Sequence, residues 1–97
     1  MTIYIRIDKN NPIAKLLYEL LTSRETPEWS DDFLDGELLY IFEIRFDDRA
    51  PDLFRICKCN GRHILLYTDF EYSWDITSYT EISKTDLEKI DIYVMFL

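Results

Sequence analysis

The chain has 97 residues, enough for one ordinary domain, and we expect a single domain over residues 1–97. Hydrophobic residues make up 47% of the sequence and aromatic residues 15%, which excludes an intrinsically disordered chain. The 19 acidic and 11 basic residues give a net charge of -8, which argues against direct binding to nucleic acid or to an anionic membrane but permits a basic protein as partner.

Targeting and redox signals point to the cytoplasm. No apolar run approaches the ~20 residues that cross a bilayer, and the N-terminal residues MTIYIRIDKNN alternate in polarity, unlike a signal peptide. The sequence contains only two cysteines, Cys57 and Cys59, which are too few for a disulfide scaffold. We therefore expect a cytoplasmic protein with no membrane association.

The first two elements are predicted from their hydrophobic spacing. Isoleucines alternate with polar residues over residues 2–7, which indicates a half-buried strand. Asn11 can then cap a helix that begins at Pro12. The leucines that follow, at positions 16, 17, 20 and 21, recur at the spacing of one helical face. This pattern predicts a long amphipathic helix over about residues 12–23.

A short helical turn and a strand are expected next. Ser30 can cap a turn over residues 31–34, and Gly36 would end that turn. Every second residue is apolar over residues 38–46, which predicts a strand, and Leu39 and Ile41 make the start of its other face apolar too. The apolar face of this strand comprises Leu38, Tyr40, Phe42, Ile44 and Phe46.

The dipeptide Asn60-Gly61 is typical of a two-residue hairpin turn, because both turn positions require a positive φ. It predicts strands over residues 53–59 and 62–68. The expected register pairs Cys59 with Arg62, Lys58 with His63, Cys57 with Ile64 and Ile56 with Leu65.

The remaining residues are predicted to be mostly strand. Residues 69–82 are strand-like with a break near Ser73, and Ser83 or Thr85 can cap a short helical turn after them. Residues 90–97 are apolar on both faces, which is typical of an interior strand.

This order of elements predicts an α+β fold. We expect a mostly antiparallel β-sheet with the one long amphipathic helix, residues 12–23, packed on one face. We also expect the two terminal strands to pair near the middle of the sheet.

Acidic residues are concentrated in two blocks. Residues 28–52 contain nine acids and two arginines, and residues 69–97 contain seven acids and two lysines, whereas residues 53–68 contain three bases and no acid. Like charges held close together cost stability, so such blocks favour a basic partner. Solvated acidic faces are also common in small domains, so a role in solubility alone stays open.

Residues 69–75, DFEYSWD, form the most informative acidic stretch. On a strand, Asp69, Glu71 and Asp75 would share one side and the aromatic residues the other. Carboxylates two residues apart on a strand lie about 7 Å apart, similar to neighbouring phosphates along one DNA strand. A row of them can therefore imitate a phosphate backbone, and the acids of residues 28–37 and of Asp47-Asp48 could extend it.

In size and acidity, and in the stretches WSDDFLDGE, FDD and DFEYSWD, the chain resembles phage-encoded anti-CRISPR proteins of the DNA-mimic type. The resemblance is to inhibitors that occupy the site for double-stranded DNA on the type I-F Csy (Cascade) surveillance complex. It implies an acidic protein without catalysis or cofactor that blocks DNA binding in the cytoplasm of an infected bacterial host. These inhibitors share no sequence motif, so the resemblance transfers no residue role.

Under this hypothesis, carboxylates of the acidic stretches meet lysines and arginines of the partner. These residues are Glu28, Asp31, Asp32, Asp35, Glu37, Asp47, Asp48, Asp69, Glu71 and Asp75. Affinity also needs an aromatic anchor, for which Trp29, Phe33 and Tyr79 are the candidates. The same acidity supports an alternative, an immunity or antitoxin-like protein that neutralises a basic nuclease or toxin.

The remaining candidate groups do not favour metal binding or catalysis. The hairpin register directs His63 away from the face shared by Cys57 and Cys59, which opposes a common metal site or a Cys–His catalytic pair. Paired carboxylates for glycoside hydrolysis stay open, but nothing distinguishes two of the 19 acids. We therefore expect no enzymatic activity, no metal and no cofactor.

Overall fold

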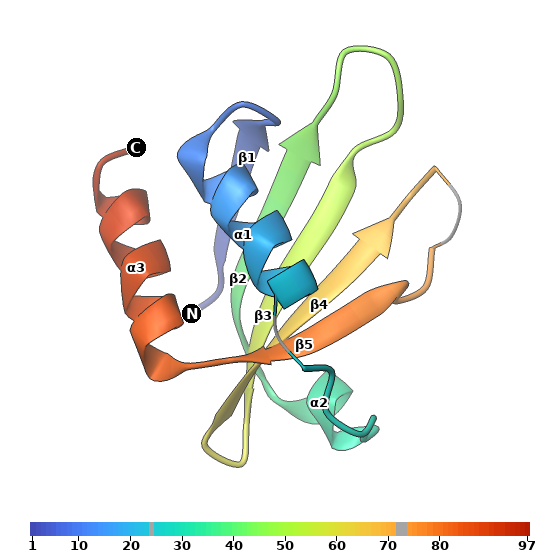
Figure 1. Cartoon of the computed structure of the whole chain (residues 1–97), viewed down its shortest axis with the longest axis vertical. Coiled ribbons are helices and arrows are strands. Elements are labelled where there is room, and N and C mark those ends of the chain that lie inside the picture. Colours follow the sequence, from blue (N-terminus) through green and yellow to red (C-terminus); the bar gives the residue numbers. More distant parts are fainter. Residues whose placement is uncertain (24, 72–73) are drawn as a thin grey trace.

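The computed structural model describes residues 1–23, 25–71 and 74–97. Its elements in chain order are β1 (Ile3–Asp8), α1 (Pro12–Ser23), α2 (Asp32–Asp35), β2 (Glu37–Arg45), β3 (Asp52–Cys59), β4 (Arg62–Asp69), β5 (Ser78–Ile82) and α3 (Lys84–Met95). The strands form one sheet in the order β1-β2-β3-β4-β5. Figure 1 shows α1 and α3 on one face of this sheet and α2 at the end where β2 begins.

The fold is α+β with a mostly antiparallel sheet, but the prediction of one long helix packed on that sheet is wrong. The helical residues that the structure describes are divided over three short helices, with 12 residues each in α1 and α3 and 4 in α2. The sheet is mixed, because β1 pairs in parallel with β2 while the other neighbours are antiparallel. The chain crosses back over the sheet through α1, so β2 runs in the same direction as β1.

Of the C-terminal residues 90–97 predicted as an interior strand, 90–95 form the second half of α3 instead, and the last two follow the helix. The local cause is a capping box, in which the Ser83 hydroxyl accepts a hydrogen bond from the Asp86 N–H (3.1 Å) and the Asp86 carboxylate accepts one from the Ser83 N–H (3.4 Å). Leu87, Ile90 and Val94 then face the core from one side of the helix. The expected pairing of two terminal strands is therefore wrong, and β1 lies at an edge of the sheet.

The larger core lies between the sheet and the helices α1 and α3. The buried side of α1 consists of Ile13, Ala14, Leu17 and Leu20, which recur at helical spacing. Asn11 caps this helix as predicted, since its Oδ1 accepts a hydrogen bond from the Ile13 N–H at 2.9 Å. The sheet contributes the buried residues Ile7, Tyr40, Phe42, Ile44, Phe54, Ile56, Leu65 and Ile82.

A smaller core lies against α2 on the other face of the sheet, because neighbouring strand residues point to opposite sides. Its buried residues are Phe33, Cys57, Cys59, Ile64 and Leu66. Leu38 packs here and not beside Tyr40, because a β-bulge between these two residues shifts the register of β2. The apolar face predicted for residues 38–46 is therefore divided between the two cores.

The hairpin of β3 and β4 has the predicted turn and register. Asn60 and Gly61 both have positive φ, at 51° and 77°. The strands pair Cys59 with Arg62, Lys58 with His63, Cys57 with Ile64 and Ile56 with Leu65.

The strand expected over residues 69–82 is divided into separate elements. β4 ends at Asp69, and β5 begins only at Ser78. The break predicted near Ser73 lies outside the described residues. Because Glu71 and Asp75 fall between the two strands, the strand spacing expected for these carboxylates does not exist.

Gly36 allows the end of α2 to lie close to β3, and this close approach requires a residue without a side chain. A Cβ atom at this position would lie 2.6 Å from the backbone oxygen of Lys58, which cannot move without disturbing β3. We expect Gly36→Ala to lower the free energy of unfolding by about 1–3 kcal/mol, as overpacking does elsewhere. Urea unfolding followed by tryptophan fluorescence measures this change. Leu34→Ala, at a 52% exposed position of the same helix, is the control, and an unchanged midpoint for Gly36→Ala would contradict the close approach.

Candidate functional site

Five acidic residues surround α2, and all are exposed to solvent: Glu28, Asp31, Asp32, Asp35 and Glu37. We call these five the α2 acidic patch. Among residues 1–23, 25–71 and 74–97, none of the five forms an ion pair. A depression of about 440 Å³ next to α2 is lined by Asp32, Asp35 and Glu37 and by one cation, Lys58. The structure thus brings together the first block of predicted site residues.

An aromatic cluster fixes the segment that carries this patch. Phe33 is buried at the centre of the smaller core, so its predicted role as a contact residue is wrong. Trp29 packs edge-on against Phe33 and Tyr79, with ring centroids 5.4 Å and 4.9 Å away. The Tyr79 hydroxyl donates a hydrogen bond to the Pro27 carbonyl at 2.8 Å. These contacts hold the acidic segment against β4 and β5.

Trp29 lies at the border between this cluster and the solvent. One side of its ring contacts the cluster, while 37% of the residue is exposed. Its indole N–H donates a hydrogen bond to Asp31 Oδ1 at 3.0 Å, which orients both the ring and one carboxylate of the patch. A partly exposed tryptophan beside charged groups is a common feature of protein interfaces.

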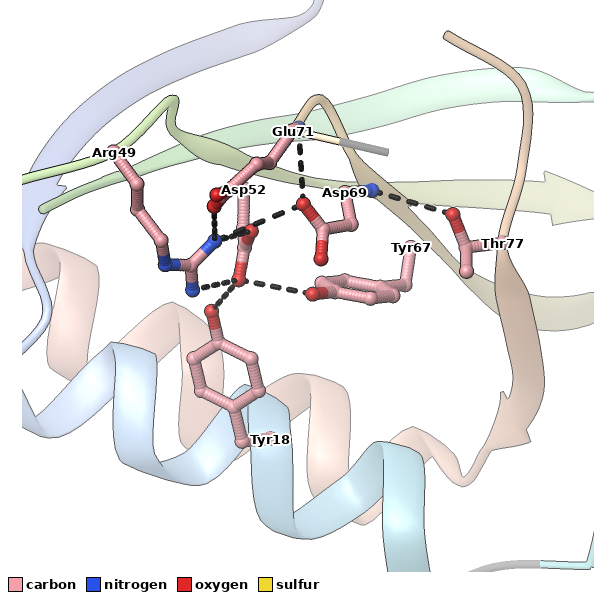
Figure 2. Close-up of polar contacts among 7 residues, drawn as sticks. All are labelled: Tyr18, Arg49, Asp52, Tyr67, Asp69, Glu71 and Thr77. Atoms are coloured by element: carbon pink, nitrogen blue, oxygen red, sulfur yellow. Dashed lines mark hydrogen bonds and ion pairs between the residues drawn. The ribbon is translucent and has the colours of Figure 1, made fainter. Parts of the chain in front are cut away.

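Three other acids surround Arg49, as Figure 2 shows. Asp52 is completely buried, and both its oxygens accept hydrogen bonds from the Arg49 guanidinium, at 3.0 and 3.3 Å. The Tyr18 and Tyr67 hydroxyls also donate to Asp52 Oδ2, Tyr67 at 3.0 Å. These bonds satisfy the buried carboxylate, which makes the cluster structural.

Asp69 and Glu71 belong to this cluster and not to a row on a strand. Each has a carboxylate oxygen 3.7 Å from Arg49 Nη1. The Glu71 N–H also donates a hydrogen bond to Asp69 Oδ1 at 3.0 Å (Figure 2). Asp75 lies further along, exposed in a bend between β4 and β5. The predicted imitation of a phosphate row by these acids is therefore wrong, because β4 ends at Asp69.

Asp47 and Asp48 are exposed in the loop between β2 and β3. This loop and α2 lie at opposite ends of β2 (Figure 1). The nine residues of β2 span about 26 Å at a rise of ~3.3 Å per residue. Asp47 and Asp48 consequently do not extend the α2 acidic patch, and they form a separate acidic end of the sheet.

The polar network also changes the acid–base behaviour of its tyrosines. Burial, followed by hydrogen bonding to Asp52, raises the pKa of Tyr18 and of Tyr67. Burial and a hydrogen bond to Asp91 raise the pKa of Tyr40 to about 12. The hydrogen bonds to Asp52 raise the pKa of Arg49, which keeps its positive charge.

Sequence reasoning did not identify Asp52. Its only local signal is an arginine three residues earlier followed by an apolar strand. Asp47 and Asp48, in the same acidic stretch, are exposed. Asp52 differs from them because Tyr18 and Tyr67, which are distant in sequence, donate hydrogen bonds to its carboxylate.

Three findings concern other features that the sequence analysis considered. In the part of the chain that the structure describes, no three His, Cys, Asp or Glu side chains are grouped as metal ligands would be. Cys57 and Cys59 are both buried in the smaller core, and burial raises the pKa of the Cys57 thiol. None of the described helices is long and apolar enough to cross a membrane.

Comparison of the chain with protein-family models, curated proteins and solved structures found no match.

Removing the charge of Asp52 tests the structural role of the Arg49 cluster. We expect Asp52→Asn to lower the free energy of unfolding by about 2–4 kcal/mol, less than for a fully buried ion pair because Arg49 is partly exposed. Asp48→Asn, an exposed position in the neighbouring loop, is the matched control. Urea unfolding at pH 7 measures both, and equal midpoints for the two variants would contradict a structural role for Asp52.

The raised pKa of Tyr40 predicts a loss of stability at alkaline pH. The unfolded chain releases this proton near pH 10, whereas the folded chain keeps it until about pH 12. Stability from this group is thus complete below pH 10 and is lost as the pH rises through 12. Tyr40→Phe should be less stable at pH 8 and should lose less stability than wild type between pH 10 and 12. Parallel slopes in urea titrations across this range would contradict the prediction.

Proposed function

We propose that this chain is a non-enzymatic inhibitor whose α2 acidic patch binds a basic surface that another protein uses to hold nucleic acid. The specific partner proposed is the DNA-binding surface of a type I-F Csy (Cascade) surveillance complex in an infected bacterial host. Binding there would exclude the target duplex by direct competition.

The observation that supports this proposal is the concentration of unpaired charge at α2. Five exposed carboxylates lie within residues 28–37, and none forms an ion pair with the described residues. Holding like charges together is unfavourable for the isolated chain, and lysines or arginines of a partner would relieve that repulsion. Opposite charge on the two surfaces would also accelerate association and make it depend on salt.

The aromatic cluster supplies the second requirement of a protein interface. Charge alone gives fast encounter but modest affinity, which usually depends on a desolvated aromatic or arginine residue. Trp29 is available for this role because it is partly exposed and held by Phe33 and Tyr79. Its hydrogen bond to Asp31 limits its motion, so little side-chain entropy would be lost on binding.

The acidic residues that the structure groups together are not spaced along a strand. The proposal rests on charge density at α2, with Asp47 and Asp48 forming a second acidic group about 26 Å away along β2. This separation corresponds to about eight base pairs of duplex. A groove that holds DNA could therefore contact one or both acidic ends, and the two ends must be tested separately.

Charge reversal at each end provides this test. We expect Asp32→Lys with Asp35→Lys to weaken binding to the Csy complex at least ~10-fold, a loss of about 1.4 kcal/mol. Asp47→Lys with Asp48→Lys makes the same change in net charge at the other end and shows whether that end also contacts the complex. Surface plasmon resonance on the immobilised complex, with duplex DNA as competitor, measures both. Simultaneous binding of duplex and this chain, or equal affinities for wild type and the α2 variant, would contradict the proposal.

Co-purification from the native host separates this proposal from its alternative. A CRISPR surveillance complex should accompany the tagged chain, and the α2 charge-reversal variant should lose it. Recovery of a basic nuclease or toxin would instead favour an immunity or antitoxin-like function for the same patch.

A further inference from the structure

The second half of α3 exposes a group of large apolar side chains. Ile92 is 55% exposed, Tyr93 43%, Met95 76% and Phe96 83%. We call these four residues the α3 apolar patch. Successive helical residues turn by about 100°, so Ile92, Tyr93 and Met95 share one continuous arc of about 160°, and Phe96 directly follows the helix. This arc lies opposite Ile90 and Val94, the side that packs on the core.

The exposed apolar area of this patch can be compared with that of ordinary monomers and of protein interfaces. The exposed parts of the four side chains total on the order of 500 Å². That area lies in the upper part of the ~300–600 Å² range of the largest apolar patch on ordinary monomers. It is also about two-thirds of the ~800 Å² that each partner contributes to a standard protein interface. The area is therefore suited to a weak, reversible interface.

The patch also has a shape that can accept its own side chains. A depression of about 440 Å³ is lined by Leu16 of α1 and by Lys89, Ile92 and Tyr93 of α3. Phe96 follows the last helical residue, Met95, four positions after Ile92, and is 83% exposed. A projecting ring beside an apolar depression is self-complementary, which is what a two-fold symmetric interface requires.

The distribution of charge favours a second copy at this position. Although the net charge of the chain is -8, α3 has two lysines against three acids and is nearly neutral. Figure 1 shows that α3 lies on the side of the molecule away from α2 and apart from the loop between β2 and β3. Two copies that met at either acidic end would repel each other, whereas contact through α3 keeps those ends apart.

We propose that the α3 apolar patch is the interface of a homodimer with two-fold symmetry. Phe96 of each copy enters the depression between α1 and α3 of the other copy. The proposal is independent of the proposed inhibitor function, because it involves no residue of the α2 acidic patch.

Sedimentation velocity of the full chain between 10 and 500 µM tests this proposal. We expect a reversible change from the 11.7 kDa monomer to a species of twice that mass. The dimer should become more stable between 0.15 and 1 M NaCl, because salt screens the repulsion between two acidic chains and strengthens apolar contact. A monomer at 500 µM under both conditions would overturn the proposal.

Substitutions locate the interface. Phe96→Asp and Ile92→Asp should each raise the dimer dissociation constant at least ~10-fold, since each places a charge in an apolar contact. Leu34→Asp, at a 52% exposed leucine on α2, adds the same charge elsewhere and should leave the dissociation constant nearly unchanged. Far-UV circular dichroism verifies that each variant folds, and Phe96→Ser replaces Phe96→Asp if the latter does not.

Two further results would exclude this interface. Equal dissociation constants for Phe96→Asp and wild type would place the dimer contact elsewhere on the molecule. A chain that stays monomeric alone but binds a different host protein through Phe96 would assign the patch to that protein.

Discussion

The buried carboxylate of Asp52 holds together segments that are distant in the sequence. It stands at the first position of β3 and accepts hydrogen bonds from Tyr18 of α1, Arg49 of the preceding loop and Tyr67 of β4. A buried carboxylate with these partners is tolerated, whereas one left without them would cost several kcal/mol. The placement of α1 on the sheet, and with it the larger core, therefore depends on this polar group as well as on apolar packing.

The same network determines where negative charge remains available. Arg49 attracts the carboxylates of Asp69 and Glu71 in addition to Asp52. Other arginines pair with acids across the sheet, Arg6 with Glu43 and Arg62 with Glu81. Five of the carboxylates that such pairs leave uncompensated lie around α2, next to the partly exposed Trp29. This local concentration of charge is the basis of the proposed binding to a basic surface.

Structural features that depend on neighbouring residues could be predicted from the sequence, and features that depend on contacts between distant residues could not. Asn60-Gly61 gave the correct turn and register because the required backbone conformation belongs to those two residues. The sequence indicates a cap at Ser83 or Thr85, and Ser83 is the cap in the structure, yet the apolar residues on both faces of 90–97 predict an interior strand where α3 continues to Met95. An apolar pattern indicates a strand only where the side chains are buried, and in α3 many of them are exposed. The burial of Asp52 likewise depends on hydrogen bonds from α1 and β4, and no local sequence pattern indicates these contacts.

The exposed apolar side chains of α3 and the acidic residues around α2 lie on different parts of the molecule, so a dimer formed through α3 would leave the α2 acidic patch of each copy accessible. Figure 1 shows α2 on the side of the molecule away from α3, so two copies joined through α3 would carry their acidic patches away from the contact. A partner with repeated basic sites at a matching spacing could then bind both patches, and the second contact would form at a high effective concentration. A partner with a single basic site would gain nothing from the dimer. Dimerisation would thus strengthen binding only to repetitive targets, without any change in the α2 acidic patch itself.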